Sequence, residues 1–295
     1  MTQSSELKHY SVLLAEVLEF LPSSSSGTLL DVTAGGGGHF FAILRQKPGW
    51  RGECWDRDPA ACERINAASQ DFAGRYTFVQ KNFSEAPAPS SAPFDYILAD
   101  LGISSFQLDD PNRGLSFYSS AQLDFRMNPE QGESFVDWLK GKSSKELEEI
   151  LVKYGEELRA KKIALKLKEI DPSVHKSSKA FSEELMRLLH MRVKKNEAHP
   201  LTRVFQALRI AINGELSELE ALLNWAPAAL APGGRLAIIS FHSLEDRKVK
   251  RAFMALEQKG FRILTDKALT PTEKEVHENT RSRSAKLRVL ERMSD

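Results

Sequence analysis

The stretch TLLDVTAGGGGHFFAILRQKPGWRGECWD, residues 28–56, decides the fold of this chain. It begins with a β-rich run at 28–33, passes through four consecutive glycines, shows a helical apolar pattern from Gly38, and ends in a second β-rich run at 51–56. A strand, a crossover helix and a second strand form a βαβ unit, and such units build parallel sheets. The stretch therefore predicts an α/β protein with its glycines at the carboxyl end of the first strand.

The alternation of strands and helical patterns continues beyond this stretch. Further β-rich runs are expected to add strands to the same sheet, at residues 76–80, 94–100, 235–241, 261–265 and 287–291. The Pro- and Ser-rich segment 86–93 is typical of a loop between two of them. The chain therefore carries enough strands for an open, doubly wound sheet.

A long interruption of this alternation follows residue 100. The helical patterns that replace it lie at 134–139, 144–154, 156–170 and 178–189. Helical periodicity then runs from 202 to 230, before the strand at 235–241 resumes the sheet. We therefore predict a Rossmann-like core formed by residues 1–108 and 200–295, split by an inserted, mainly helical substrate-recognition subdomain at 109–199.

The composition excludes several classes of protein. With 295 residues, 41% hydrophobic and 27% charged, the chain can bury a core, which excludes a mainly disordered protein. No apolar run approaches the roughly 18 residues that cross a bilayer, and the first residues show no signal-peptide pattern, so we expect a cytoplasmic protein without a membrane partner. Two cysteines, Cys54 and Cys62, do not make a disulfide framework or a zinc site, so no metal is expected.

Charge is balanced over the whole chain but not locally. The formal net charge is +1, which by itself does not indicate nucleic-acid binding. Residues 153–197 contain twelve Lys or Arg against seven Asp or Glu, and residues 281–292 contain five against one. Local basic surfaces are therefore expected.

The glycines at 35–38 and Asp56 together predict a site for a nucleoside-containing cofactor. Ligands of open parallel sheets bind beyond the carboxyl ends of the strands, where glycine lets the backbone come close and a helix amino terminus offers N–H groups. Asp56 ends the second strand, where a carboxylate can bond ribose hydroxyls. A flexible turn is the alternative for the glycines alone. Phe40 occupies the third position of G-x-G-x-x-G and no Gly-Lys-Ser/Thr follows, so S-adenosylmethionine fits better than a nicotinamide dinucleotide or ATP.

Longer motifs extend this interpretation along the chain. In order, they include DVTAGGGGH at 31, DRDPAA at 56, LADLGISSFQLDDPNRGLSF at 98, HPLTRVFQALRIAINGEL at 199, SFHSLEDRKVK at 240 and NTRSRSAKLRVLER at 279. With these motifs the chain closely resembles the bacterial 16S ribosomal RNA cytosine-N4 methyltransferase family. The resemblance implies a Rossmann-like class I methyltransferase core and transfer of a methyl group from S-adenosylmethionine to N4 of a cytidine in the decoding region of 16S rRNA.

The resemblance also implies which residues contact the cofactor. They are Gly37, Gly38, His39, Asp56, Phe83, Asp100 and Gln107. In this assignment the glycine loop receives the methionine end, and Phe83 offers an apolar face to adenine. Asp100 and Gln107 supply polar contacts near the reacting end.

Two residues are candidates for catalysis. Cytosine N4 is a poor nucleophile, and a hydrogen-bond acceptor on its N–H restores electron density; Asp100 or the carbonyl groups of Leu101 and Gly102 are the alternatives. His242 follows the strand at 235–241 and can orient the base or accept a proton. Each also has a structural explanation, because a strand-end Asp often caps a turn and His242 precedes an expected helix at 244–258.

Basic residues near the expected crevice are candidates for pairing with RNA phosphates. They are Arg113, Arg203, Arg209, Arg247, Arg281, Arg283 and Arg288, together with Lys286. Phe117 is a candidate for stacking on an extruded base with Arg113 beside it. The alternative for such charges is an ordinary solvated surface. The expected partner is 16S rRNA, within the small ribosomal subunit, and both a monomer and a homodimer stay open.

Two other functions compete with this one. The first is a noncatalytic RNA-binding ribosome-assembly factor that retains a cofactor pocket, and the intact glycine loop with Asp56 and Asp100 argues against it. The second is a small-molecule methyltransferase, which the local basic surfaces disfavour.

Overall fold

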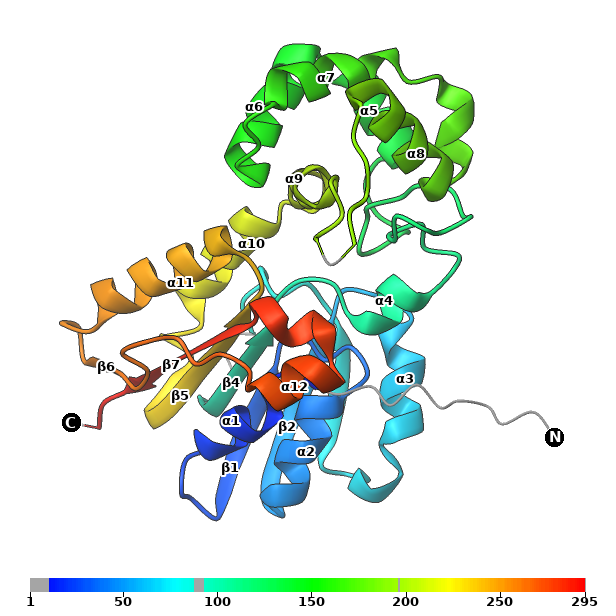
Figure 1. Cartoon of the computed structure of the whole chain (residues 1–295). Coiled ribbons are helices and arrows are strands. Elements are labelled where there is room, and N and C mark those ends of the chain that lie inside the picture. Colours follow the sequence, from blue (N-terminus) through cyan, green and yellow to red (C-terminus); the bar gives the residue numbers. More distant parts are fainter. Residues whose placement is uncertain (1–10, 88–92, 196, 295) are drawn as a thin grey trace. The chain divides into compact units, whose positions relative to one another are not determined.

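The computed structural model describes residues 11–87, 93–195 and 197–294, which form two compact units (Figure 1). One unit combines Met1–Gly102 with Leu216–Asp295, and the other is Ile103–Glu215. We call them the sheet unit and the helical unit. Residues 88–92 of the expected loop lie outside the described residues.

The sheet unit contains a seven-stranded sheet in the order β3-β2-β1-β4-β5-β7-β6. The strands are β1 (Ser26–Asp31), β2 (Gly49–Asp56), β3 (Tyr76–Gln80), β4 (Phe94–Asp100), β5 (Leu230–Ser240), β6 (Phe261–Ile263) and β7 (Lys286–Arg292). The first five are parallel, and β7 runs antiparallel to β5 and β6. The order reverses beside β1, so both halves of the sheet are wound outward from it. The predicted α/β fold is confirmed.

Both faces of this sheet are buried, because alternate residues of its strands enter two different cores. In β4, Tyr96 and Leu98 belong to one core, whereas Ile97 and Ala99 belong to the other. Helix α2 (Gly38–Gln46) packs into the first core, and α10 (Glu215–Trp225) and α11 (Ser243–Leu256) pack into the second. The remaining helical segments of the sheet unit are α1 (Leu14–Glu19), α3 (Ala61–Ala68), α12 (Glu273–Glu278) and the 3-10 turns η1 (Gln70–Phe72) and η3 (Thr280–Ser284).

The helical unit has its own core of leucines and aromatic rings, among them Phe125, Phe135, Phe181 and Phe205. Its helices are α4 (Ser105–Asp109), α5 (Phe135–Gly141), α6 (Ser144–Gly155), α7 (Ala160–Glu169), α8 (Ser178–Leu189) and α9 (Thr202–Asn213), with the 3-10 turn η2 (Pro172–Lys176). None of the helices in the described residues has the length and apolar character that a membrane crossing needs.

The helical unit is longer at both ends than the subdomain expected at 109–199, because it begins at Ile103 and ends at Glu215. Segment 200–215 belongs to the helical unit because Val204, Phe205 and Leu208 of α9 are buried in its core. The helical periodicity expected at 202–230 is divided between two helices, because Gly214 adopts a φ of 65° and separates α9 from α10. The helix expected from 156 begins only at Ala160, because α6 ends in a left-handed turn at Glu156.

Candidate cofactor and active site

Three carboxylates end neighbouring parallel strands of the sheet unit. Asp31 is the last residue of β1 and pairs in register with Cys54 of β2 and Leu98 of β4. Asp56 and Asp100 come two residues after those partners, so all three acids lie at the carboxyl edge of the sheet. This is the edge at which open α/β sheets bind ligands.

The glycine loop is anchored to this edge by Asp56. Its Oδ2 accepts a hydrogen bond from the Gly35 amide at 2.7 Å, and its Oδ1 accepts one from the Asp58 amide at 2.8 Å. Burial raises the pKa of Asp56, while these two amide donors act in the opposite direction. A carboxylate has about four acceptor positions, so the proposed ribose contact remains open to Asp56 alongside its structural one.

Close packing explains why Gly37 and Gly38 are glycines. Gly37 caps α2 with a φ of 80°, which an L side chain rarely adopts, and a Cβ there would meet the Phe41 ring. A Cβ on Gly38 would collide with Ser11 Oγ. The conformation of this loop therefore requires glycine. The role of Gly37 and Gly38 in receiving the methionine end of the cofactor stays a prediction.

Asp100 has a buried oxygen without a partner. Within the described residues, its Oδ1 has no hydrogen-bond partner, and its Oδ2 lies 3.7 Å from His39 Nδ1. Burial, and then the nearby charges of Asp31 and Glu245, raise the pKa of Asp100 well above its ordinary value. Buried polar atoms are almost always satisfied, so this oxygen indicates a place for a ligand donor or cation. The site therefore fits a positively charged cofactor.

The His39 ring is held from its other side. Its Nε2 lies 2.9 Å from the carbonyl oxygen of Val12, which only accepts, so Nε2 carries a proton. His39 is 6% exposed. His39 and Asp100 thus lie together at the carboxyl edge, and their contacts with the cofactor stay predictions.

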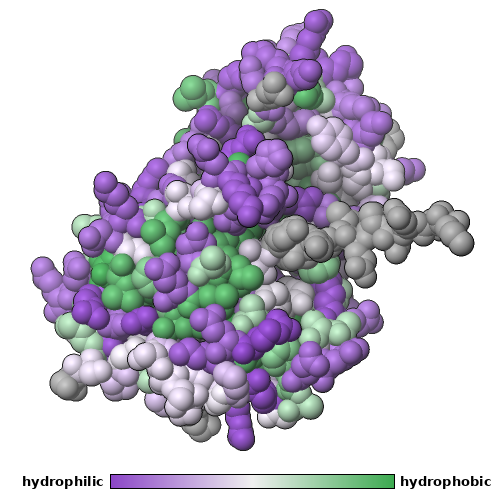
Figure 2. Space-filling view, turned by 60° about the horizontal axis from the view of Figure 1, so that its bottom comes forward, coloured by the Kyte–Doolittle hydropathy of each residue, from purple (hydrophilic) through white to green (hydrophobic). Residues whose placement is uncertain are grey.

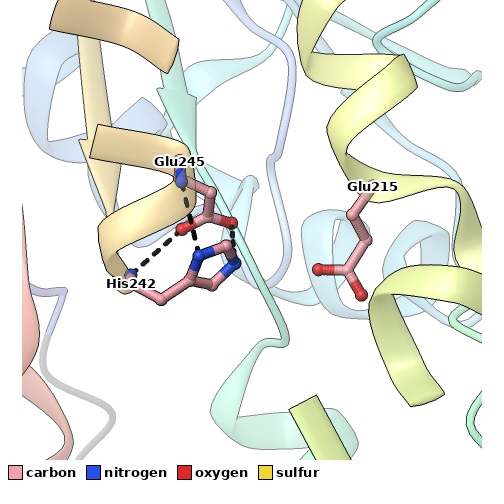
Figure 3. Close-up of side chains that lie close together, drawn as sticks. All are labelled: Glu215, His242 and Glu245. Carbon is pink, nitrogen blue, oxygen red and sulfur yellow. Dashed lines mark hydrogen bonds and ion pairs between the residues drawn. The ribbon is translucent and has the colours of Figure 1, made fainter. Parts of the chain in front are cut away.

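His242 caps the helix that follows β5, as Figure 3 shows. Its Nδ1 accepts a hydrogen bond from the Glu245 amide, and its Nε2 lies 3.2 Å from Glu245 Oε1. The Glu245 carboxylate in turn accepts from the amides of Phe241 and His242. Helix capping accounts for the position of His242. Its role in catalysis remains a prediction.

The loop that carries Phe83 is held by α10. The Trp225 indole N–H donates to the Phe83 carbonyl oxygen at 3.0 Å, and the Asn82 amide donates to Glu218 Oε1 at 2.6 Å. Arg57, next to Asp56, donates to the other oxygen of Glu218 at 2.7 Å. Glu218 therefore ties together the loops after β2 and β3. Neither Glu218 nor Trp225 was predicted from the sequence.

We expect Trp225→Phe to weaken S-adenosylmethionine binding by roughly fivefold, because it removes one hydrogen bond of about 1 kcal/mol from the Phe83 loop while keeping an aromatic ring. Calorimetric titration measures the dissociation constant. Trp50→Phe is the matched control, since it loses a similar bond to Ser24 at the opposite end of the strands. Equal affinities in the two variants would contradict the role of this loop.

Gln107 belongs to the helical unit and closes a capping box at the start of α4. Its side-chain oxygen accepts from the Ser104 amide at 3.1 Å, and its Nε2 donates to the Met127 carbonyl at 3.4 Å. The side chain is 6% exposed. These bonds fit a structural role, and a cofactor contact stays a prediction.

Three of the candidate RNA-binding arginines are engaged inside the protein. Arg288 is buried and donates to Asp246 at 2.7 Å, and Lys286 bonds the other oxygen of the same carboxylate. Arg209 makes a bidentate pair with Glu215, and Arg113 donates to the Met127 carbonyl at 2.6 Å. These contacts fit structural roles better than phosphate binding. The exposed candidates are Arg203, Arg247, Arg281 and Arg283.

Apolar side chains also gather on the surface of the sheet unit (Figure 2). A pocket of about 680 Å³ in this unit is lined by Leu223, Pro232, Ala252 and Phe261, among others. Pro232 lies near the start of β5, whereas the candidate site lies beyond its end at Ser240. This pocket is therefore at the opposite edge from the carboxylates and is not part of the candidate site.

The sheet order, the antiparallel β7, the glycine loop and the acidic strand ends define a Rossmann-like class I methyltransferase. The family model described as the MraW methylase family matches residues 6–293. The chain belongs to the MraW methylase family. It is a methyltransferase whose methyl donor is S-adenosylmethionine.

Curated relatives cover nearly the whole chain. "Ribosomal RNA small subunit methyltransferase H" of Picosynechococcus sp. is 43% identical over 288 residues, which are 98% of each chain. The protein of the same name from Sorangium cellulosum is 42% identical over 299 residues, covering 97% of this chain and 91% of the relative. Among solved structures, a putative rRNA methylase from Clostridium thermocellum aligns with a TM-score of 0.48 and 11% identity, covering 96% of this chain and 99% of that one.

Proposed function

We propose that this protein methylates N4 of a cytidine in the decoding region of 16S rRNA, as the naked RNA or within the small ribosomal subunit in the cytoplasm. The relatives named as small-subunit rRNA methyltransferases, at about 43% identity over nearly the whole chain, support rRNA as the substrate. The family resemblance of the motifs supports N4 of cytidine and the decoding region. The helical unit is proposed to recognise the RNA.

The cofactor supplies an electrophilic methyl group on a sulfonium sulfur. The task of the protein is to hold that methyl in line with the acceptor nitrogen, a positioning effect that can lower a barrier by roughly 7–11 kcal/mol. Asp56 holds the glycine loop through the Gly35 amide, and the open Oδ1 of Asp100 would pair with the positive charge of the bound cofactor. As the N–C bond forms and the methyl–sulfur bond breaks, Asp100 or the carbonyls of Leu101 and Gly102 would accept a hydrogen bond from the N4 N–H. His242 is the candidate that would take up the proton that N4 loses.

The state of the cysteines supports an amine acceptor over a ring carbon. Methylation at cytosine C5 needs a cysteine thiolate that attacks C6. Cys54 is fully buried in β2, and burial followed by the nearby charge of Asp31 raises the pKa of its thiol well above the ordinary value. Its sulfur donates to the Thr77 carbonyl instead. Cys62 lies within α3, which follows β2.

The Cys54→Ala, Cys62→Ser double variant is therefore expected to retain methyl transfer, with N4-methylcytidine as the product. The measurement is nucleoside mass spectrometry of 16S rRNA treated with the variant or with the unmodified protein. A methyl group on C5 would overturn the proposed chemistry. So would loss of activity in a variant that still folds and binds S-adenosylmethionine.

Salt dependence tests the basic segment near the carboxyl end. Arg281 and Arg283 are exposed in η3, and replacing both with Ala is expected to reduce the slope of log affinity against log salt by roughly 0.7–0.9 per lost phosphate contact. The Arg45→Ala, Arg51→Ala double variant removes the same charge from exposed positions elsewhere in the sheet unit and is the control. If both double variants give the same slope, the RNA does not contact η3.

A further inference from the structure

Tyr118 is the more exposed of the two Phe, Tyr or Trp side chains that are exposed in the described part of the helical unit, the other being Phe106 at 37%. Tyr118 is 68% exposed, the largest exposed fraction of any Phe, Tyr or Trp side chain among residues 11–87, 93–195 and 197–294. Phe117, the residue suggested by the sequence for stacking on a base, is instead half-buried and packs against the core of this unit.

Tyr118 stands on a stack that is anchored in the core. The rings of Phe117 and His199 are stacked with centroids 4.0 Å apart at 15°, and Phe117 also contacts Phe205 at 4.4 Å. Tyr118 meets His199 edge to face, at 5.9 Å and 88°. The ring of Tyr118 therefore has a fixed base beneath it while most of its surface stays open.

The backbone around Tyr118 is also fixed. Ser178 at the start of α8 donates from its hydroxyl to the Ser116 carbonyl at 2.7 Å and from its amide to the Ala121 carbonyl at 2.9 Å. The Lys179 amide donates to the Ser119 carbonyl at 2.9 Å. These bonds bracket Tyr118 on both sides, so the ring is held in place before any partner binds, which lowers the entropic cost of binding.

Exposed lysines lie in the segment whose backbone is bonded to the residues around Tyr118. Lys176 and Lys179 lie on either side of Ser178 and are exposed. The Lys179 ammonium is 4.0 Å from Glu183 Oε1, which is a long distance for an ion pair. The segment that leads to His199 adds further exposed cations, Arg192, Lys194 and Lys195, of which Lys194 pairs with Glu197 at 3.3 Å. A flat aromatic surface beside cations is the combination with which proteins bind single-stranded nucleic acid.

We propose that Tyr118 stacks on an unpaired base of the rRNA substrate, while Lys176 and Lys179 pair with the adjoining phosphates. This inference rests on the proposed function, because it takes the substrate to be RNA. It assigns the stacking role to Tyr118 in place of Phe117, and the phosphate contact to α8 and the turn before it in place of Arg113. Phe117 and His199 position the Tyr118 ring.

Tyr118→Ala is expected to weaken binding of naked 16S rRNA by about tenfold, since one stacked base contributes that much. Tyr118→Phe keeps the ring and is expected to restore the affinity. Fluorescence anisotropy with a labelled fragment of the decoding region, at several salt concentrations, measures both. The slope of log affinity against log salt should be unchanged in Tyr118→Ala and reduced in the double variant Lys176→Ala, Lys179→Ala, because only the lysines displace counterions.

A control and a reporter make the outcome specific. Leu158→Ala alters a side chain that is 95% exposed in the same unit and is expected to leave RNA binding unchanged. Tyr118→Trp places an indole at the same position, and its fluorescence should be quenched when RNA is added.

The outcomes separate this inference from the proposed function. Wild-type binding in Tyr118→Ala overturns the stacking role, even if the unmodified protein methylates rRNA. A defect seen with assembled subunits but not with naked rRNA assigns Tyr118 to a protein contact and also overturns it. Failure of the unmodified protein to methylate any rRNA contradicts the proposed function, while the binding and quenching measurements still decide the role of Tyr118.

Discussion

Replacing Asp100 with Asn is expected to weaken S-adenosylmethionine binding by roughly 30-fold or more and to reduce methyl transfer further. The change removes the charge of a half-buried carboxylate whose buried Oδ1 lacks a partner in the described part of the chain, and the loss of one partner from a desolvated ion pair costs about 2 kcal/mol or more. Because the pKa of Asp100 is raised in the cofactor-free protein, Asn imitates the protonated form. The defect should therefore grow with pH.

Titration calorimetry and single-turnover methylation at two pH values test this prediction. Asp95→Asn is the matched control, because Asp95 lies on the same strand at its amino end and bonds the amide and hydroxyl of Thr28. The control is expected to leave cofactor affinity unchanged. If Asp100→Asn behaved like Asp95→Asn, Asp100 would be a structural residue, and the carbonyls of Leu101 and Gly102 would be the remaining acceptors for N4.

The sheet could be predicted from the sequence because local patterns determine it. Continuous apolar runs such as FDYILAD are typical of strands buried on both faces, and the structure places alternate residues of β4 in two cores. The boundaries between the two units were harder to predict from the sequence. Whether α9 joins the sheet or the helices depends on which core its apolar face enters, and both choices produce the same periodicity.

The site could be predicted only where a motif is continuous in sequence. Asp56 and the glycine loop meet because a βαβ unit brings them together. Glu218 contacts Asn82 from 136 residues away, and nothing local marks it. The ion pairs of Arg209 and Arg288 could not be predicted, because their acidic partners, Glu215 and Asp246, become neighbours only in the folded chain.

Asp31 leads to a prediction about stability. It is 2% exposed at the end of β1, and burial, partly offset by the Thr33 amide and reinforced by the charge of Asp56, raises its pKa from 3.8 to about 7. Between about pH 4 and pH 7, Asp31 is therefore protonated in the folded protein and ionised in the unfolded chain. The free energy of unfolding falls as pH rises through this range. By pH 8 the loss attributable to Asp31 is about 4 kcal/mol.

Asp31→Asn cannot ionise, yet its side-chain oxygen can still accept from the Thr33 amide, as Asp31 does at 3.0 Å. We expect the cofactor-free variant to be about as stable as the unmodified protein at pH 4.5 and more stable at pH 8. Urea unfolding at a series of pH values measures this, with Asp71→Asn, at an exposed position of the same unit, as the control. If the unfolding free energy of Asp31→Asn depends on pH in the same way as that of the unmodified protein, Asp31 does not titrate in this range. If the unfolding free energy of Asp31→Asn changes less with pH than that of the unmodified protein, the carboxyl edge of the sheet maintains a buried acid at a cost in stability. A bound cation would offset this cost.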